Sequence, residues 1–327
     1  MDPAGALTGH LRGPDAVRAA CRSWLARHST AGPLIVACSG GADSLALALA
    51  LRAVDPDRPL VGATVDHGLQ DGSAAHARTT ADLLRRIGCD QVEILTVTVG
   101  RAGGPEAAAR HARYAALTEL SSGWPGAPVL LGHTADDQAE TVLLGLARGS
   151  GPRSVAGMRP WRAPWGRPLL GVTRADTEAT CAEAGVQPWR DPHNADPAFT
   201  RVRLRTEVLP LLEEVLGGGV RPALARTAEL MSDDLDALDR IAQDALDRAR
   251  TGDALSRSAL ADRPAAVRRR VLRRWLASTG AGALTHDHLV RLDAQLVDRR
   301  GPAQVRLPGG LDVWRRGDLL RAERNPG

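Results

Sequence analysis

The chain has 327 residues, of which 43% are hydrophobic and 24% are charged, and its formal net charge is +4. This is enough apolar sequence for two globular domains, and the lack of any stretch of roughly 18 apolar residues excludes a membrane-spanning helix. The four cysteines contain no Cys-x-x-Cys pair, so neither a metal site nor a disulfide framework is indicated. We expect a cytoplasmic protein whose mild basic bias is compatible with a nucleic-acid partner.

Strand-like and helix-like segments alternate along the first half of the chain. After a predicted helix at 14–28, apolar runs predict strands at 34–38, 59–65, 91–99 and 128–132, and helical patterns lie at 44–54, 73–87, 105–121 and 136–147. Such alternation is typical of an α/β fold with a doubly wound, mostly parallel sheet. Ligands of these sheets bind at the carboxyl ends of the strands.

The second half has a different character. Residues 148–172 are rich in Gly, Pro, Arg and Trp and predict a long irregular segment, which is followed by a helix near 173–184. Further helices are predicted at 264–278 and 285–298, with a short hairpin over 304–314. We therefore expect a catalytic domain at 1–212 and a smaller, mainly helical C-terminal domain at 220–327.

One loop between the first strand and its helix carries the clearest chemical signal. Its sequence is Ser39-Gly40-Gly41-Ala42-Asp43-Ser44. Glycines let backbone N–H groups approach an anion closely, and the helix N-terminus adds partial positive charge. An ordinary strand-to-helix turn would also use glycines, but the two serines and the aspartate favour a phosphate site. Asp43 could hold Mg²⁺ against those phosphates.

Two familiar nucleotide loops are excluded at this position. A Walker loop needs Gly-Lys-Ser/Thr, and the chain contains no lysine at all. The G-x-G-x-x-G spacing of a dinucleotide fingerprint is also absent.

Charged side chains gather in two later segments. Glu106, Arg110 and Arg113 share one face of a predicted helix, for which surface ion pairing is the simpler interpretation. The acidic segment (residues 133–140) begins at the end of the fourth strand and contains a histidine and three carboxylates: His133, Asp136, Asp137 and Glu140. Helix capping explains one or two carboxylates but not Glu140. This face could bind Mg²⁺ or an ammonium group.

Taken together, these motifs resemble those of the tRNA(Ile)-lysidine synthase family within the PP-loop ATP pyrophosphatase superfamily. The resemblance rests on the glycine-containing loop, Val65-Asp-His-Gly-Leu69, Glu106-Ala-Ala-Ala-Arg-x-x-Arg-Tyr114, Gly132-His-x-x-Asp-Asp-Gln-x-Glu-Thr141, Arg148-Gly-Ser-Gly151, Asp191-Pro-His-Asn194 and Arg201-x-Arg-Leu-Arg205. The match runs in order from about 34 to 212 and is weak over the last third. Val202 departs from the pattern, which has asparagine there.

The resemblance implies ATP-dependent ligation of free L-lysine to C2 of the wobble cytidine in the isoleucine tRNA with a CAU anticodon. It assigns ATP to residues 39–44 and His133, Mg²⁺ to Asp43, and the lysine amine to Asp137 and Glu140. It implies that Arg113 contacts the adenylated intermediate or the substrate carboxylate. We expect tRNA contacts from four arginines: Arg148, Arg205, Arg270 and Arg274. The division of roles among the three carboxylates and the existence of a homodimer stay open.

Three other functions compete with this assignment. A tRNA thiolase would need a cysteine pair, and a synthetase that forms amides from ammonia would usually bring a glutaminase domain, neither of which is visible. A protein that binds nucleotide or tRNA without catalysis would have no use for the carboxylate cluster, since that cluster repels RNA.

Overall fold

The computed structural model describes residues 11–28, 30–68, 72–100, 104–149, 151–189, 196–298 and 302–324. It divides into two compact units, Met1–Met231 and Ser232–Gly327, and the division falls within α10 (Val220–Ala249). The sequence predicts a break between 212 and 220, and three glycines with positive φ directly precede α10. Within the described ranges, no helix has both the length and the apolar character needed to cross a bilayer.

The first unit contains a six-stranded sheet in the order β3-β2-β1-β4-β6-β5. The four predicted strands are confirmed as β1 (Leu34–Ala37), β2 (Leu60–Asp66), β3 (Gln91–Thr96) and β4 (Val129–Leu131), all paired in parallel. The predicted helices are confirmed as α1 (Gly13–Arg27), α2 (Ala42–Val54), α3 (Ser73–Ile87), α4 (Pro105–Ser122), α5 (Ala135–Ala147) and α7 (Arg174–Glu183). The doubly wound α/β class is therefore correct.

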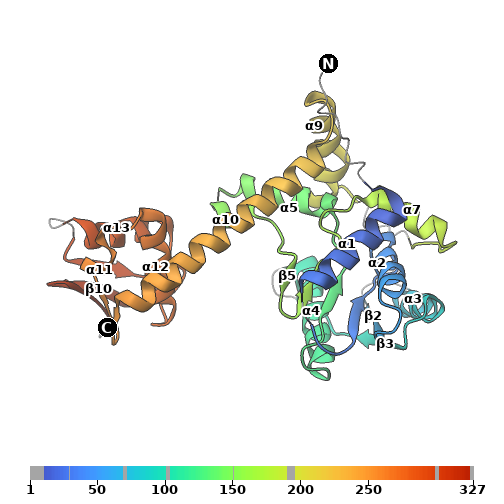
Figure 1. Cartoon of the computed structure of the whole chain (residues 1–327), viewed down its shortest axis with the longest axis horizontal. Helices are drawn as coiled ribbons and strands as arrows, with labels where there is room; N and C mark the ends of the chain where they lie inside the picture. Colours follow the sequence, from blue (N-terminus) through green and yellow to red (C-terminus); the bar gives the residue numbers. More distant parts are fainter. Residues whose placement is uncertain are drawn as a thin grey trace, which may run out of the picture. The chain divides into compact units, whose positions relative to one another are not determined.

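Apolar side chains bury both faces of this sheet, which is why its strands read as continuous apolar runs. Leu34, Val36 and Leu130 join one core with α1, α2, α3 and α7 (Figure 1). Ile35 and Val129 face the other way and pack in a second core with α4. Because both faces are covered by helices, the polar groups of the site are confined to the ends of the strands.

The segment predicted as irregular contains short elements that extend the sheet. It forms α6 (Pro152–Val155), β5 (Trp161–Arg162) and β6 (Trp165–Gly166), and β6 pairs in parallel with β4. Two-residue strands are too short to give an alternating pattern, so the sequence did not reveal them. The indole of Trp24 in α1 fixes this segment by donating a hydrogen bond of 2.9 Å to the carbonyl of Pro160.

Three short helical pieces lead from the site toward α10: α8 (Thr200–Arg203), the π-helical turn η2 (Leu204–Val208) and α9 (Leu209–Val215). Val202 is only 5% exposed, which suits an apolar residue at the position where the family pattern has asparagine. Leu209 packs with Ala139 of α5 and Val220 of α10 in a small core of its own. This packing brings the pieces to the acidic segment.

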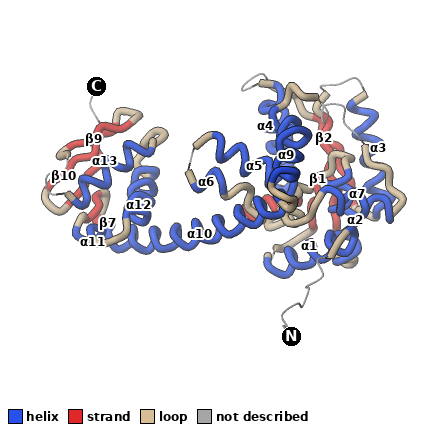
Figure 2. Tube along the Cα trace, turned by 90° about the horizontal axis from the view of Figure 1, so that it is seen from above, coloured by secondary structure: helices blue, strands red, loops and turns tan. Residues whose placement is uncertain are grey.

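The second unit combines helices with an antiparallel sheet. Its further helices are α11 (Ser258–Ala261), α12 (Ala265–Ala277) and α13 (His286–Val297). The predicted hairpin is present as β9 (Gln304–Leu307) and β10 (Leu311–Arg316), within a sheet completed by β7 (Arg250–Thr251), β8 (Ala254–Ser256) and β11 (Leu319–Arg324). α12 and α13 lie beside this sheet (Figure 2) and share one apolar core with it.

Candidate functional site

The carboxyl ends of β1 and β4 are adjacent and bring the two predicted motifs together. β1 leads into the glycine loop (residues 39–44), and β4 leads through Gly132 into the acidic segment. A Cβ added to Gly132 would lie 2.8 Å from the carbonyl oxygen of Asp43 and 2.9 Å from the amide nitrogen of Ser44. Only glycine permits so close a backbone approach.

The glycine loop is braced from within by Ser44. The Ser44 hydroxyl donates to the carbonyl of Gly41 at 3.0 Å and accepts from the amide of Ser39 at 3.2 Å. Gly40 has a φ of +79°, a backbone conformation that favours glycine. The loop runs into the first turn of α2, so its backbone can present N–H groups to an anion, as the sequence predicts.

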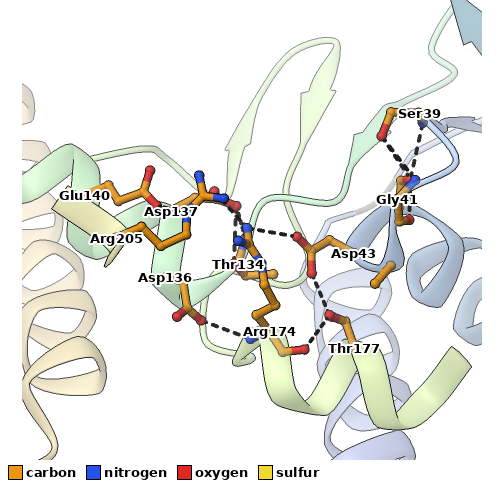
Figure 3. A network of polar contacts seen from close by, with 12 residues as sticks. Ser39, Gly41, Asp43, Thr134, Asp136, Asp137, Glu140, Arg174, Thr177 and Arg205 are labelled. Atoms are coloured by element: carbon orange, nitrogen blue, oxygen red, sulfur yellow. Dashed lines mark hydrogen bonds and ion pairs between the residues drawn. The ribbon is translucent and has the colours of Figure 1, made fainter. Parts of the chain in front are cut away.

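Asp43 faces α7 and is held there by two side chains (Figure 3). The hydroxyl of Thr177 donates to its Oδ1 at 2.5 Å, and Arg174 donates to its Oδ2 at 3.2 Å. Burial raises the pKa of the Asp43 carboxyl, and the charge of Arg174 and the hydrogen bond from Thr177 oppose that rise. Asp43 therefore links the glycine loop to α7.

Asp136 and Asp137 both take part in structural contacts at the start of α5. Asp137 completes a capping box with Thr134, whose amide donates to Asp137 Oδ2 at 2.9 Å. Asp136 accepts from the backbone amide of Arg174 at 2.9 Å and pairs with Arg221 of α10 at 3.1 Å. Arg174 also lies 3.6 Å from Asp137 Oδ1, so this one arginine bridges the two motifs (Figure 3).

Glu140 lies one turn further along α5, and its side chain is only 1% exposed. Arg205 of η2 donates to its Oε1 at 2.8 Å, and Arg201 lies 3.7 Å from its Oε2. Burial raises the pKa of the Glu140 carboxyl, while the charge of Arg205 opposes the rise. Oε2 is buried and accepts no hydrogen bond from the part of the chain that the structure describes. Oε2 thus has an ion-pair partner in Arg201 but lacks a hydrogen bond.

His133 and Arg113 form a cationic neighbourhood beside Asp137. Burial lowers the pKa of His133 to about 4, and the nearby charges of Arg167, Arg110 and Arg113 contribute to the lowering. Its Nδ1 is buried and has no partner among the described residues. Burial also lowers the pKa of the Arg113 guanidinium. A neutral imidazole beside several guanidinium groups suits contact with an anionic ligand.

The structure places the arginines predicted to bind tRNA in different settings. Arg148 is exposed at the C-terminal end of α5. Arg205 faces Glu140, as described above. Arg270 pairs with Asp239 of α10 at 3.1 Å, while Arg274 lies 3.4 Å from the same carboxylate. The contacts of these side chains with RNA stay a prediction.

Several residues of the site carried no signal in the sequence. Arg174, Thr177 and Arg221 contact the predicted carboxylates, although Arg174 lies 131 residues from Asp43 along the chain. The motif at 191–194 lies outside the described residues. Within the described ranges, no group of three His, Cys, Asp or Glu residues could hold a metal ion. All four cysteines are free and buried, and burial raises the pKa of Cys38 in the strand before the loop.

Comparison with known proteins agrees with this geometry. Residues 17–212 match a family model described as a PP-loop domain, and residues 255–321 match one described as a TilS substrate binding domain. A tRNA(Ile)-lysidine synthase of Rhodococcus erythropolis is 52% identical over 312 residues, which cover 93% of this chain and 94% of the relative. One of Nocardia farcinica is 54% identical over 301 residues, covering 91% of this chain and 93% of that protein.

A solved structure shows a similar fold. The U34-tRNA thiolase NcsA of Methanococcus maripaludis superimposes with a TM-score of 0.55 at 18% identity, covering 67% of this chain and 79% of that one. The motifs in order, the paired strand ends and the matches over more than nine-tenths of the chain lead to one conclusion. The chain belongs to the tRNA(Ile)-lysidine synthase family.

Proposed function

We propose that this protein ligates L-lysine to C2 of the wobble cytidine of an isoleucine tRNA with a CAU anticodon, consuming ATP and releasing AMP and pyrophosphate. In the first step the cytosine O2 attacks the α-phosphorus of ATP and pyrophosphate leaves. In the second step the lysine ε-ammonium loses a proton, the resulting amine attacks C2 and loses a second proton, and AMP leaves. Adenylation is needed because an unmodified O2 is a poor leaving group.

The open oxygen of Glu140 is the observation that carries this proposal. A buried carboxylate oxygen without a hydrogen bond is costly, and an ammonium group is the donor that would best satisfy it. The free lysine amine has a pKa of ~10.4 and arrives as ammonium. Glu140 would hold that group, with Asp137 beside it on the same helix. Because the chain has no lysine of its own, no internal side-chain amine competes for this position.

The glycine loop would bind the triphosphate, and the cationic neighbourhood would receive the adenylated base. Backbone N–H groups of residues 39–44 would stabilise the negative charge that develops on the phosphates, the task that a lysine performs in a Walker loop. His133 stays neutral near pH 7 and can donate a hydrogen bond, while Arg113 supplies charge to the phosphate or to the substrate carboxylate. The target base must leave the stack of the anticodon loop before O2 can reach the nucleotide.

Mg²⁺ fits this site only as a companion of ATP. Both oxygens of Asp43 already accept hydrogen bonds, so its carboxylate could supply one ligand while the phosphates supply others. Mg²⁺ bound in this way would neutralise charge on the leaving pyrophosphate.

The test is pyrophosphate release from ATP, tRNA transcript and a panel of nitrogen and sulfur donors. We expect release to require the tRNA and the modified base to appear only with L-lysine. Equal modification with ammonia, or with sulfide as the donor, would overturn the proposal. The buried thiols argue against the sulfur reaction.

A second experiment separates the carboxylates. Asp137→Asn keeps an oxygen that can cap α5, so the helix start should survive. We expect the KM for lysine to rise at least tenfold while MgATP binding stays within twofold. An equal loss of lysine use and MgATP binding would instead place Asp137 with the nucleotide.

A further inference from the structure

Two residues hold the glycine loop from one side: His76 through a ring nitrogen and Trp189 through its backbone amide. His76 on α3 lies with its Nε2 2.9 Å from the carbonyl oxygen of Ser39. The backbone amide of Trp189, a few residues beyond α7, donates to the carbonyl of Gly40 at 2.9 Å. The His76 and Trp189 rings contact each other, with centroids 3.8 Å apart. Consecutive carbonyls of the loop are thus held by the His76 ring and by the Trp189 backbone, whose side chain packs against that ring at an interplanar angle of 33°.

These two anchors determine where the next two N–H groups point. In a trans peptide the C=O and the following N–H point in opposite directions. Because the carbonyls of Ser39 and Gly40 are directed toward His76 and Trp189, the amides of Gly40 and Gly41 are directed away from them, and the Gly41 amide donates a long hydrogen bond of 3.5 Å to the Ser39 hydroxyl. Successive backbone N–H groups pointing the same way form a concave anion-binding surface.

The neighbours of Gly40 show that the fit is tight. A Cβ added to Gly40 would lie 2.7 Å from the Thr80 hydroxyl and 2.8 Å from Cε1 of His76. Thr80 is fully buried, so the wall behind the loop cannot readily move away. A carbonyl oxygen only accepts hydrogen bonds, and His76 must therefore carry its proton on Nε2.

We propose that His76 and Trp189 are positioning residues that keep the glycine loop in its triphosphate-binding conformation. They touch the loop backbone and not the reacting atoms. The inference rests on the proposed function to the extent that ATP occupies residues 39–44. We call the contacts of His76 and Trp189 with the glycine loop the clasp. If the clasp is lost, we expect MgATP binding to weaken while lysine recognition and the chemical step stay intact.

The experiment measures MgATP binding by calorimetry together with steady-state kinetics for all three substrates. His76→Phe keeps a ring against Trp189 but removes the donor, and we expect the Kd and KM for ATP to rise about tenfold, the size of one lost hydrogen bond. His76→Gln returns an N–H donor and should recover most of the loss. His286→Phe, an exposed histidine of the second unit, is the matched control and should change neither value.

The outcomes separate the clasp from the function. Unchanged MgATP binding in His76→Phe, or an equal fall in kcat with all three substrates, would overturn the clasp. If His76→Phe does not fold, Trp189→Ala removes the ring that packs against His76 while keeping the backbone donor to Gly40, with an expected threefold rise in the Kd for ATP and no rise as the contrary result. A wild-type protein that binds MgATP without modifying tRNA would refute the proposed function alone, because the binding arm needs neither lysine nor tRNA.

Discussion

Buried carboxylates paired with arginines occur in both units, but their hydrogen bonding differs. Asp293 in the second unit accepts from Arg268 on one oxygen and from Arg268 and Arg269 on the other. Glu140 in the first unit accepts from Arg205 on Oε1 only, and its Oε2 accepts no hydrogen bond among the described residues. A pair in which both carboxylate oxygens accept hydrogen bonds fixes neighbouring helices, whereas the oxygen of Glu140 that accepts none suits the proposed contact with a cationic substrate. The sequence singles out Glu140 by its place in the acidic segment, but it does not reveal the difference in hydrogen bonding between the two carboxylates.

Removing the charge of Glu140 and, separately, that of Asp293 tests most directly whether the two carboxylates have different roles. We expect Glu140→Gln to lower kcat/KM for lysine at least 100-fold, because the amide cannot neutralise an ammonium group. We expect Asp293→Asn to leave kcat/KM within threefold and to lower the free energy of unfolding by about 3 kcal/mol, since two arginines lose their partner. Steady-state kinetics and urea unfolding measure the pair. Normal lysine use in Glu140→Gln would mean that the amine is held elsewhere.

Removing the cation of the first pair tests how firmly Glu140 depends on Arg205. Arg205→Met leaves a buried carboxylate with Arg201 at 3.7 Å as its remaining partner, and we expect a loss of about 3 kcal/mol in stability. The double variant Glu140→Gln with Arg205→Met should regain most of that stability but no lysine use. Additive losses of stability in the double variant would show that the two side chains are not coupled.

The stability of the first unit should also depend on pH, because burial keeps His133 neutral. Its folded pKa of about 4 lies below the ordinary value of 6.5, so its contribution is complete above pH 6.5 and is lost as the pH falls from there toward 4. We expect the wild type to lose about 2 kcal/mol more than His133→Asn between pH 7.5 and pH 5. Denaturant titrations at both values measure this, and equal losses would show that His133 is protonated in the folded protein.

The smallest expected effect is on the salt dependence of tRNA binding, through the arginines of α12. Arg270 and Arg274 are already paired with Asp239, whereas Arg273 on the same helix is exposed. If this helix meets the tRNA backbone, Arg273→Ala should reduce the slope of log Kd against log salt by about 1, with little change in stability. Arg270→Ala combined with Arg274→Ala should change that slope less and lower stability more. The reverse ranking would return these two residues to the RNA interface.

Local patterns predicted the parts of the site that are local in sequence. The glycine loop and the start of α5 each lie within one strand-to-helix connection, and their placement at adjacent strand ends follows from the alternation of elements. Capping by Asp137 was also foreseeable from Thr134 three residues earlier. The sheet order was constrained to a few possibilities by the same rules.

The partners of these groups were not foreseeable. Arg174, Thr177 and Arg221 come from helices far along the chain, and nothing in their own neighbourhoods distinguishes them from surface residues. The orientation of Arg205 toward Glu140 depends on the π-helical turn η2, which has no pattern of its own in the sequence. The long-range ion pairs of the site are therefore known from the structure and not from the sequence.

The contact at Gly132 has a mechanical consequence. With the backbone of residue 132 packed directly onto the first turn of α2, a shift of one loop must displace the other. A ligand seated by the first loop would therefore alter the setting of His133 and the carboxylates without any intermediary side chain. Every substitution at this position would push the two loops apart, so a saturation library should tolerate glycine alone there.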